Sequence, residues 1–243
     1  MSATAKTEIR TLKAGDMTLE YTLERKAVRR INLRVQRDGS IHVSAPPRAA
    51  LSVIEGFLAK KADWITAARE RAEQRLGEPL SLSDGATLPI LGISHTVWGV
   101  KAKKQGAFCA EGRLILQLRD PENAEERRRV FERFWRDEAT RVLTARVQAL
   151  YPLFADHVRS FPVLTFRQMK SRWGSCTAAK GHVTLNTNLL FVPPALCDYV
   201  ILHELCHFKH QDHSAAFYAH LSRFYPAYAT ARARLRAFPI PQF

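Results

Sequence analysis

The sequence has few cysteines, and none of them is placed for a cysteine-only metal site. The 243 residues include four, and no two of these are spaced as C-x-x-C. They are Cys109, Cys176, Cys197 and Cys206. This spacing argues against a zinc site built from cysteines alone. In a chain of this length it is typical of reduced, mostly buried thiols in a cytoplasmic protein.

Long apolar runs are also missing. Residues 1–15 are polar and lack the apolar core of a signal peptide. No run elsewhere approaches the roughly 20 apolar residues that a membrane-spanning helix needs. Hydrophobic residues nevertheless make up 46% of the chain, which indicates a folded core rather than disorder. We therefore expect a soluble, cytoplasmic protein without a membrane span.

Acidic residues are scarce relative to basic ones. The chain has 23 Asp and Glu against 37 Lys and Arg, which gives a net charge of +14. Such an excess favours a polyanionic partner, nucleic acid or a nucleotide. The alternative is that arginine-rich helix faces are simply solvated, and the sequence leaves both open. A glycine-rich phosphate-binding loop is absent from the sequence.

Hydrophobic patterning predicts an α+β fold whose N-terminal half is rich in strands. Residues 31–35 alternate between apolar and polar, and Asp38-Gly39 is typical of a hairpin turn. One long helix is expected over about residues 49–75. Short strands are expected near 88–91, 96–100 and 114–118. We place a domain boundary near residue 120 and interpret residues 1–120 as a substrate-binding or partner-binding domain.

The C-terminal half, residues 121–243, is expected to be rich in helices, with a small antiparallel sheet beside the helix discussed next. Asp120 and Pro121 are placed to begin a long helix, with Asp120 as its cap. A strand at 163–169 and a return strand at 182–189 would form the sheet. Further helices are expected at about 194–210, at about 214–224 and after Pro226.

One predicted helix carries His203-Glu204-Leu205-Cys206-His207, which matches H-E-x-x-H. Residues four apart lie about 40° apart around a helix axis, so both histidines can direct a ring nitrogen at one ion. Glu204 lies beside them and can reach a water on that ion. The apolar stretch 199–202 before the motif is typical of a buried helix; a run of surface histidines is the alternative. The pattern predicts a zinc ion (Zn2+) on His203 and His207.

A catalytic zinc ion needs a third protein ligand and an exchangeable water. Four of the nine histidines lie between residues 203 and 213. His210 can stay on the same helical face as His203. His213 lies beyond Gln211-Asp212, where the helix is expected to break and the chain can turn back. We favour His213 and keep His210 as the alternative.

These residues predict a zinc-dependent hydrolase, most simply a metallopeptidase acting on a protein or peptide. The metal would polarise a carbonyl and acidify its bound water, and Glu204 would act as the general base. The developing oxyanion needs a second donor. Arg172 is a candidate, and the alternative is a surface arginine stacked on an aromatic ring.

The C-terminal block resembles the YgjP-like metallopeptidase family, which is related to SprT-like and other gluzincin-type metallopeptidases. The resemblance rests on Arg172-Trp173-Gly174-Ser175-Cys176, on Leu185-Asn186, and on H-E-x-x-H followed by His213-Ser214. The segments Arg29–Leu33 and Ala45-Pro46-Pro47 in the first half are also similar. The resemblance therefore covers nearly the whole chain.

This resemblance implies a zincin-like catalytic unit over residues 121–243. Its zinc ligands would be His203, His207 and His213, with Glu204 as the catalytic residue. In such folds the edge of a sheet beside the metal can hold an extended peptide, and the region from Arg172 to Asn186 is the best candidate for supplying that edge. The candidate substrate-binding residues are Arg172, Trp173 and Asn186.

Several alternatives stay open. Core packing is the alternative role for Trp173. The resemblance also implies a competing activity, a metal-dependent nucleoside triphosphate (UTP) pyrophosphatase. A nucleic-acid-associated protease is a third hypothesis, and its binding residues would lie in the first half. They would be Arg29, Arg30, Arg34, Lys60 and Lys61.

Overall fold

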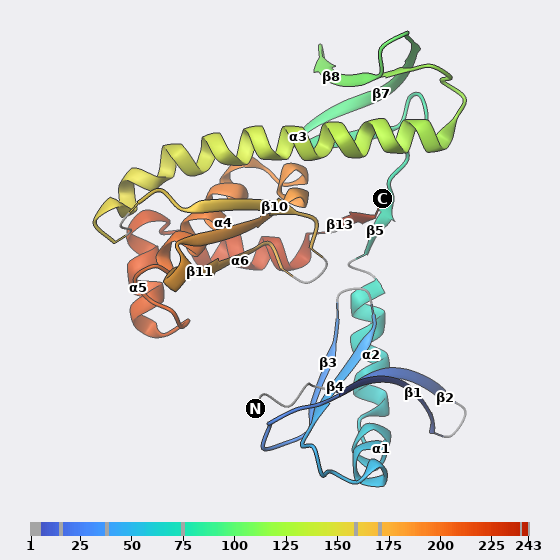
Figure 1. Ribbon diagram of the computed structural model, residues 1–243, viewed down its shortest axis with the longest axis vertical. Helices are drawn as coiled ribbons and strands as arrows, with labels where there is room; N and C mark the ends of the chain where they lie inside the picture. The colour runs from blue at the N-terminus through green and yellow to red at the C-terminus, as the bar shows by residue number, and fades with distance from the viewer. Residues whose placement is uncertain are drawn as a thin grey trace. The chain divides into compact units, whose positions relative to one another are not determined.

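The computed structural model describes residues 6–14, 17–36, 39–73, 76–157, 160–169, 172–238 and 240–242. The chain folds into two compact units, residues 1–77 and 78–243, which we call unit 1 and unit 2. Each unit buries its own hydrophobic cluster. Strands dominate the N-terminal half and helices the C-terminal half (Figure 1), so the predicted α+β class is confirmed.

Unit 1 combines a four-stranded sheet with two helices. Its elements are β1 (Lys6–Ala14), β2 (Met17–Arg25), β3 (Asn32–Val35), β4 (Ile41–Ala45), α1 (Leu51–Ala59) and α2 (Ala62–Glu73). The strand order is β1-β2-β4-β3. Alternate residues of β2 and β4 share a core with one face of α1, because every second side chain of a strand points to the same face. These side chains are Leu19, Tyr21, Leu23, Ile41, Val43, Ile54 and Leu58.

The single helix expected over residues 49–75 is in fact two helices. A turn at Lys60 and Lys61 separates α1 from α2. The Lys61 N–H donates to the Leu58 carbonyl at 3.0 Å, a tighter pattern than that of an α-helix. Strands β1 and β2 are additional to the sequence prediction, although the alternation of Leu19, Tyr21 and Leu23 is a strand signal.

From residue 76 onward the chain forms three further sheets, four α-helices and three 3-10 helices (η) in its described part. The elements are β5 (Leu76–Pro79), β6 (Thr87–Ile90), β7 (Ile93–Lys101), β8 (Gly106–Ala110), β9 (Arg113–Leu118), α3 (Ala124–Leu150), η1 (Tyr151–His157), β10 (Val163–Arg167), β11 (Gly174–Thr177), η2 (Ala178–Lys180), β12 (His182–Asn186), η3 (Thr187–Phe191), α4 (Pro194–Cys206), α5 (Ala215–Phe224), α6 (Tyr228–Ala237) and β13 (Ile240–Gln242). The strand orders are β6-β7-β9-β8, β10-β12-β11 and β13-β5.

Helix α3 packs on two sides. It contacts β8 and β9 on one side and α4 and β10 on the other (Figure 1). Its cap is Asn123, whose side chain accepts the Glu126 N–H at 2.9 Å. Asp120, the expected cap, instead accepts the Glu122 N–H at 3.1 Å. No described helix, α3 included, has the length and apolar character needed to cross a membrane.

The two units divide between residues 77 and 78, whereas the sequence interpretation placed a boundary near residue 120. The sheet β6-β7-β9-β8 explains the difference. Leu88 and Leu114 from its strands lie in the same buried cluster as Trp135 of α3. The sheet therefore belongs with α3 in unit 2 and does not form part of an N-terminal domain.

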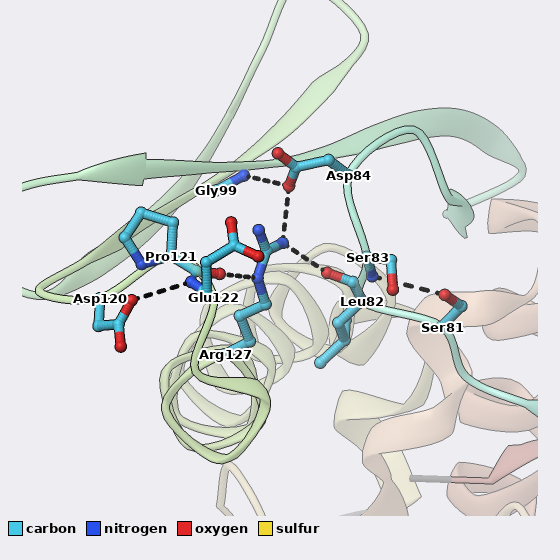
Figure 2. A network of polar contacts seen from close by, with 9 residues as sticks. All are labelled: Ser81, Leu82, Ser83, Asp84, Gly99, Asp120, Pro121, Glu122 and Arg127. Atoms are coloured by element: carbon cyan, nitrogen blue, oxygen red, sulfur yellow. Dashed lines mark hydrogen bonds and ion pairs between the residues drawn. The ribbon is translucent and has the colours of Figure 1, made fainter.

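A buried arginine joins the start of α3 to this sheet (Figure 2). Arg127 Nη1 lies 2.7 Å from Asp84 Oδ1 and donates to the Leu82 carbonyl at 2.8 Å. The Arg127 Nε donates to the Pro121 carbonyl at 2.6 Å. Asp84 also accepts the Gly99 N–H at 2.8 Å. A Cβ at Gly99 would lie 2.5 Å from Arg127 Nη2, so glycine leaves the room that the guanidinium occupies.

The small sheet beside α4 is mixed rather than antiparallel. Strand β11 runs antiparallel to β12, but β10 runs parallel to β12. The expected antiparallel pairing of 163–169 with 182–189 is therefore wrong. Strand β11 lies between them in the chain and reverses the direction before β12 begins. In the described sheet β11 occupies an edge, and it contacts α4.

Candidate metal centre

Helix α4 presents the H-E-x-x-H residues at its C-terminal end. Pro194 lies in its first turn, where a missing N–H costs no hydrogen bond. Residues 199–202 are all buried, so this helix packs inside unit 2. His203 lies in the last turn and His207 is the C-terminal cap. The helix ends at Cys206, earlier than the predicted end near residue 210.

The structure brings His203, His207 and His213 together. One ring nitrogen of each lies within 4.8 Å of the others, and the Nε2 atoms of His203 and His213 are 3.0 Å apart. The nitrogen ligands of a tetrahedral zinc ion lie about 2.0 Å from the metal and about 3.3 Å from one another. The three rings are therefore arranged to share one cation.

Burial keeps the His203 and His207 rings in the form that binds a metal. Burial, together with the neighbouring His207 and His213 rings, lowers the pKa of His203 to about 3. Burial also lowers the pKa of His207. Neutral imidazole, which has a free lone pair, is the metal-binding form of histidine.

Neighbouring groups orient the three rings. His207 Nδ1 lies 2.9 Å from the His210 carbonyl, and donation to that oxygen leaves the His207 Nε2 lone pair for a metal. Phe217 of α5 is fully buried and packs against all three rings, with centroids 4.8 or 4.9 Å away. His203 Nδ1 is buried and has no hydrogen-bond partner among the described residues.

His213, and not His210, lies with the other two rings. It sits in the loop between α4 and α5, and the next residue, Ser214, caps α5 by accepting the Phe217 N–H. The His210 ring instead packs against His220, with centroids 5.3 Å apart. The end of α4 turns the chain back on itself, and this turn carries His213 to the H-E-x-x-H residues.

Glu204 is a buried carboxylate beside the histidines, with an exposed fraction of 5%. Burial raises its pKa to about 8, and the charge of Arg172 opposes that shift. Gly174 of β11 lies directly against it, because a Cβ at that position would be 2.6 Å from Glu204 Oε1. Glycine therefore allows the strand to approach the carboxylate closely.

The histidines and Glu204 line an open cleft of about 540 Å³. Its facing wall consists of β11 and η2, and exposed Arg172 lies two residues before β11. The wall residues other than glycine are Ser175, Cys176, Thr177, Ala178 and Ala179. The sequence interpretation placed this sheet edge between Arg172 and Asn186, but of the residues that line the cleft it named only Arg172 as a substrate contact. The packing of β11 against α4 decides which of residues 174–179 face the cleft. A local sequence pattern does not predict this packing.

Trp173 and Asn186 do not line the cleft. The Trp173 side chain is 8% exposed and lies in the hydrophobic core, 6.3 Å from the Phe238 ring between centroids. Asn186 is fully buried, and its Nδ2 donates to the carbonyls of Met169 and Arg172 at 2.7 and 2.8 Å. We therefore replace the expected substrate contacts with structural roles: Trp173 packs the core and Asn186 anchors the segment that leads to β11.

Known proteins resemble this chain to different extents. The sequence model of the family described as "YgjP-like, metallopeptidase domain" matches residues 29–238. The metallopeptidase zymogen jannalysin of Methanocaldococcus jannaschii is 19% identical, with a TM-score of 0.35 over 39% of this chain and 93% of its own. The zymogen abylysin of Pyrococcus abyssi is 21% identical, with a TM-score of 0.33 over 37% of this chain and 90% of its own. No curated protein matches the chain.

The family match has the same extent as the resemblance expected from the motifs. It begins in unit 1 and ends after α6, and so includes the cleft and all three histidines. With residues 29–238 matched, the chain belongs to the YgjP-like metallopeptidase family.

Proposed function

We propose that this metallopeptidase uses zinc bound by His203, His207 and His213, with Glu204 as its general base. The observation that carries the proposal is the convergence of three imidazole nitrogens within 4.8 Å beside a buried carboxylate. Neutral imidazoles suit the borderline-soft zinc ion, and three protein ligands leave one position of a tetrahedral ion open. A bound zinc ion supplies Lewis-acid polarisation and an acidified water.

Glu204 moves the proton in this proposal. Its carboxylate lies in the same cleft as the histidines, and Gly174 closes one side of it. A nearby cation favours the ionised carboxylate and so opposes the effect of burial. Ionised Glu204 accepts a proton from the attacking water and passes it to the leaving amine nitrogen.

The edge strand β11 is the proposed substrate-binding element. It lines the cleft opposite the histidines, and within the described sheet it pairs on one side with β12. An extended peptide can add to such an edge through main-chain hydrogen bonds. Exposed Arg172 lies before this strand and lines the cleft, where it is the candidate second donor to the oxyanion.

The test separates metal binding from catalysis. Glu204→Gln preserves size and removes the base, so the variant should keep zinc, measured by metal analysis, and lose peptide cleavage. We expect a loss of at least about 100-fold. Glu132 is a half-exposed carboxylate on α3 that pairs with Arg128; Glu132→Gln is the matched control and should retain both properties.

Cleavage of a peptide library by the wild type and by Glu204→Gln decides whether Glu204 takes part in the reaction. Equal cleavage by the two proteins would remove Glu204 from the reaction. The same preparations would be assayed for pyrophosphate release from UTP. If wild type released pyrophosphate and cleaved no peptide, the nucleotide pyrophosphatase hypothesis would replace the peptidase.

A further inference from the structure

The sheet β6-β7-β9-β8 has an outer face that bears large apolar side chains. Its inner face is buried against α3 through Val97, Leu114 and Leu116. Because neighbouring side chains of a strand alternate between faces, Trp98 and Ile115 point away from α3. Trp98 is 42% exposed and Phe108 of β8 is 45% exposed. The two largest side chains of this face therefore reach solvent.

The strand register places these side chains in one row. Ile115 of β9 is the partner of Trp98 on β7 and of Phe108 on β8. We call Trp98, Ile115 and Phe108 the aromatic row. Neighbouring strands lie about 4.8 Å apart, so the two aromatic residues are separated by roughly 10 Å across Ile115. Each ring has space to stack a flat group independently of the other.

Positive charge flanks the aromatic row. The turn between β7 and β8, which we call the lysine turn, carries Lys103 and Lys104, both exposed. Arg113 lies two residues before Ile115 and therefore on the same face of β9. Glu111 is the single acidic residue in the sequence from 87 to 118. In the described part of the chain, none of these three basic side chains forms an ion pair.

We propose that the aromatic row and its basic rim bind single-stranded nucleic acid. The bases of a single strand can stack on Trp98 and Phe108, while phosphates contact the lysine turn and Arg113. An acidic protein would match the charge but has few flat groups for two separated aromatic rings. A duplex keeps its bases stacked on one another and offers mainly its phosphates. A single strand offers both accessible bases and phosphates, so it matches both the aromatic row and its basic rim.

Fluorescence anisotropy on the full-length, zinc-loaded protein tests this proposal with a labelled oligothymidylate. The wild type should bind, with an affinity that falls as salt rises. Trp98→Ala combined with Phe108→Ala should weaken binding about tenfold or more, because base–aromatic contacts are lost. Trp98→Phe retains a stacking ring and should bind nearly as well as wild type. Leu153→Ala, at an exposed apolar residue of η1, is the matched control and should leave binding unchanged.

Substitutions in the lysine turn provide a second, independent test, because they leave the strands of the sheet unchanged. Replacing Lys103 and Lys104 with Gln should weaken binding and reduce the slope of log affinity against log salt by about 1.4. The same change at Arg234 and Arg236 of α6, which are also exposed, is the matched control and should have far less effect. Thermal unfolding of each variant checks that its fold is intact.

Three results would overturn the proposal. The first is wild-type affinity in the folded Trp98→Ala, Phe108→Ala protein. The second is equal binding of duplex and single strand with no dependence on either aromatic residue, which would reduce the interaction to charge alone. The third is absence of binding to any nucleic acid at low salt, which would leave a protein as the partner of this face.

Discussion

At the scale of single residues, the contact between Gly174 and Glu204 controls the position of the proposed base. The carboxylate fills the space where a side chain at position 174 would begin. A residue with a Cβ there would have to displace either β11 or the carboxylate. Because a displacement of about 1 Å at a reacting group can cost about 100-fold in rate, position 174 bears on catalysis without supplying a functional group.

Gly174→Ala should therefore lower kcat by about 10- to 100-fold while zinc content stays at the wild-type level. Steady-state cleavage of the best library peptide, with metal analysis of the same sample, measures both quantities. Gly56→Ala is the matched control, since a Cβ at Gly56 meets nothing within 4 Å and alanine favours the helix α1. Unchanged kcat in Gly174→Ala would contradict the proposed placement of Glu204.

The sequence predicted most of the histidine group because its geometry is local. Helical spacing alone brings His203 and His207 together, and the expected helix break favoured His213 over His210. Gly174 and Phe217 could not be assigned in this way. Their roles come from contacts with residues elsewhere in the chain, and a glycine or phenylalanine has no chemical signature that reports such a contact.

At the scale of secondary-structure elements, the network around Arg127 ties α3 to the sheet β6-β7-β9-β8 (Figure 2). The hydrogen bond from Arg127 lowers the pKa of Asp84 below its ordinary value of 3.8, and the Gly99 N–H acts in the same direction. A carboxyl group with a depressed pKa in the folded state stabilises the fold above its unfolded pKa. That contribution is lost as pH falls through the folded pKa.

Asp84→Asn should accordingly be less stable than wild type near neutral pH. The Asp84 carboxylate is 42% exposed and screened by solvent, so we expect a difference of at most about 1 kcal/mol in the free energy of unfolding. Urea unfolding at several pH values measures it, and the two proteins should converge as pH falls below 3.8 and through the lower pKa of Asp84 in the folded state. A difference that persists below the pKa of Asp84 would show that its charge is not the cause.

Element prediction succeeded where periodicity was sufficient and failed where tertiary contacts decide. The helix from 214 was predicted closely, because Ser214 caps it and Phe217 and Leu221 mark its buried face. The turn at Lys60 and Lys61 contains no proline or glycine, the residues that most often indicate a turn in a sequence. The parallel pairing of β10 with β12 also could not be predicted, since the short strand β11 between them forms its hydrogen bonds only within the assembled sheet.

At the scale of the whole molecule, the chain has two cores. The cluster of unit 1 contains residues between 12 and 65, and the cluster of unit 2 contains residues between 80 and 238. All three histidines, Glu204 and the facing wall of the cleft lie in unit 2. Zinc binding should therefore not depend on the hydrophobic core of unit 1.

A chain that begins at Leu76 and so retains β5 should fold and bind one zinc ion. Circular dichroism and metal analysis measure the two properties. His213→Ala in the same shortened chain is the control and should bind zinc more weakly. A shortened chain that is unfolded, or folded without zinc, would show that unit 2 depends on unit 1. The binding role expected for residues 1–120 remains a prediction.

The domain boundary was the least predictable large-scale feature. In the sequence, the short strands between 87 and 118 continue the strand-rich pattern of the first half. The helix-capping residues near 120 then indicate the beginning of a new domain. The side chains that assign these strands to unit 2, Leu88 and Leu114 among them, are ordinary apolar residues. Their partners on α3 become apparent only when the sheet and helix are seen together.

X-ray absorption at the zinc edge of the zinc-loaded protein tests the central claim most directly. The arrangement of His203, His207 and His213 predicts three imidazole nitrogens and one oxygen at about 2.0 Å, with one imidazole lost in His213→Ala. A sulfur ligand at about 2.3 Å, which Cys176 in the cleft wall could supply, or fewer than three imidazoles in the wild type would contradict it.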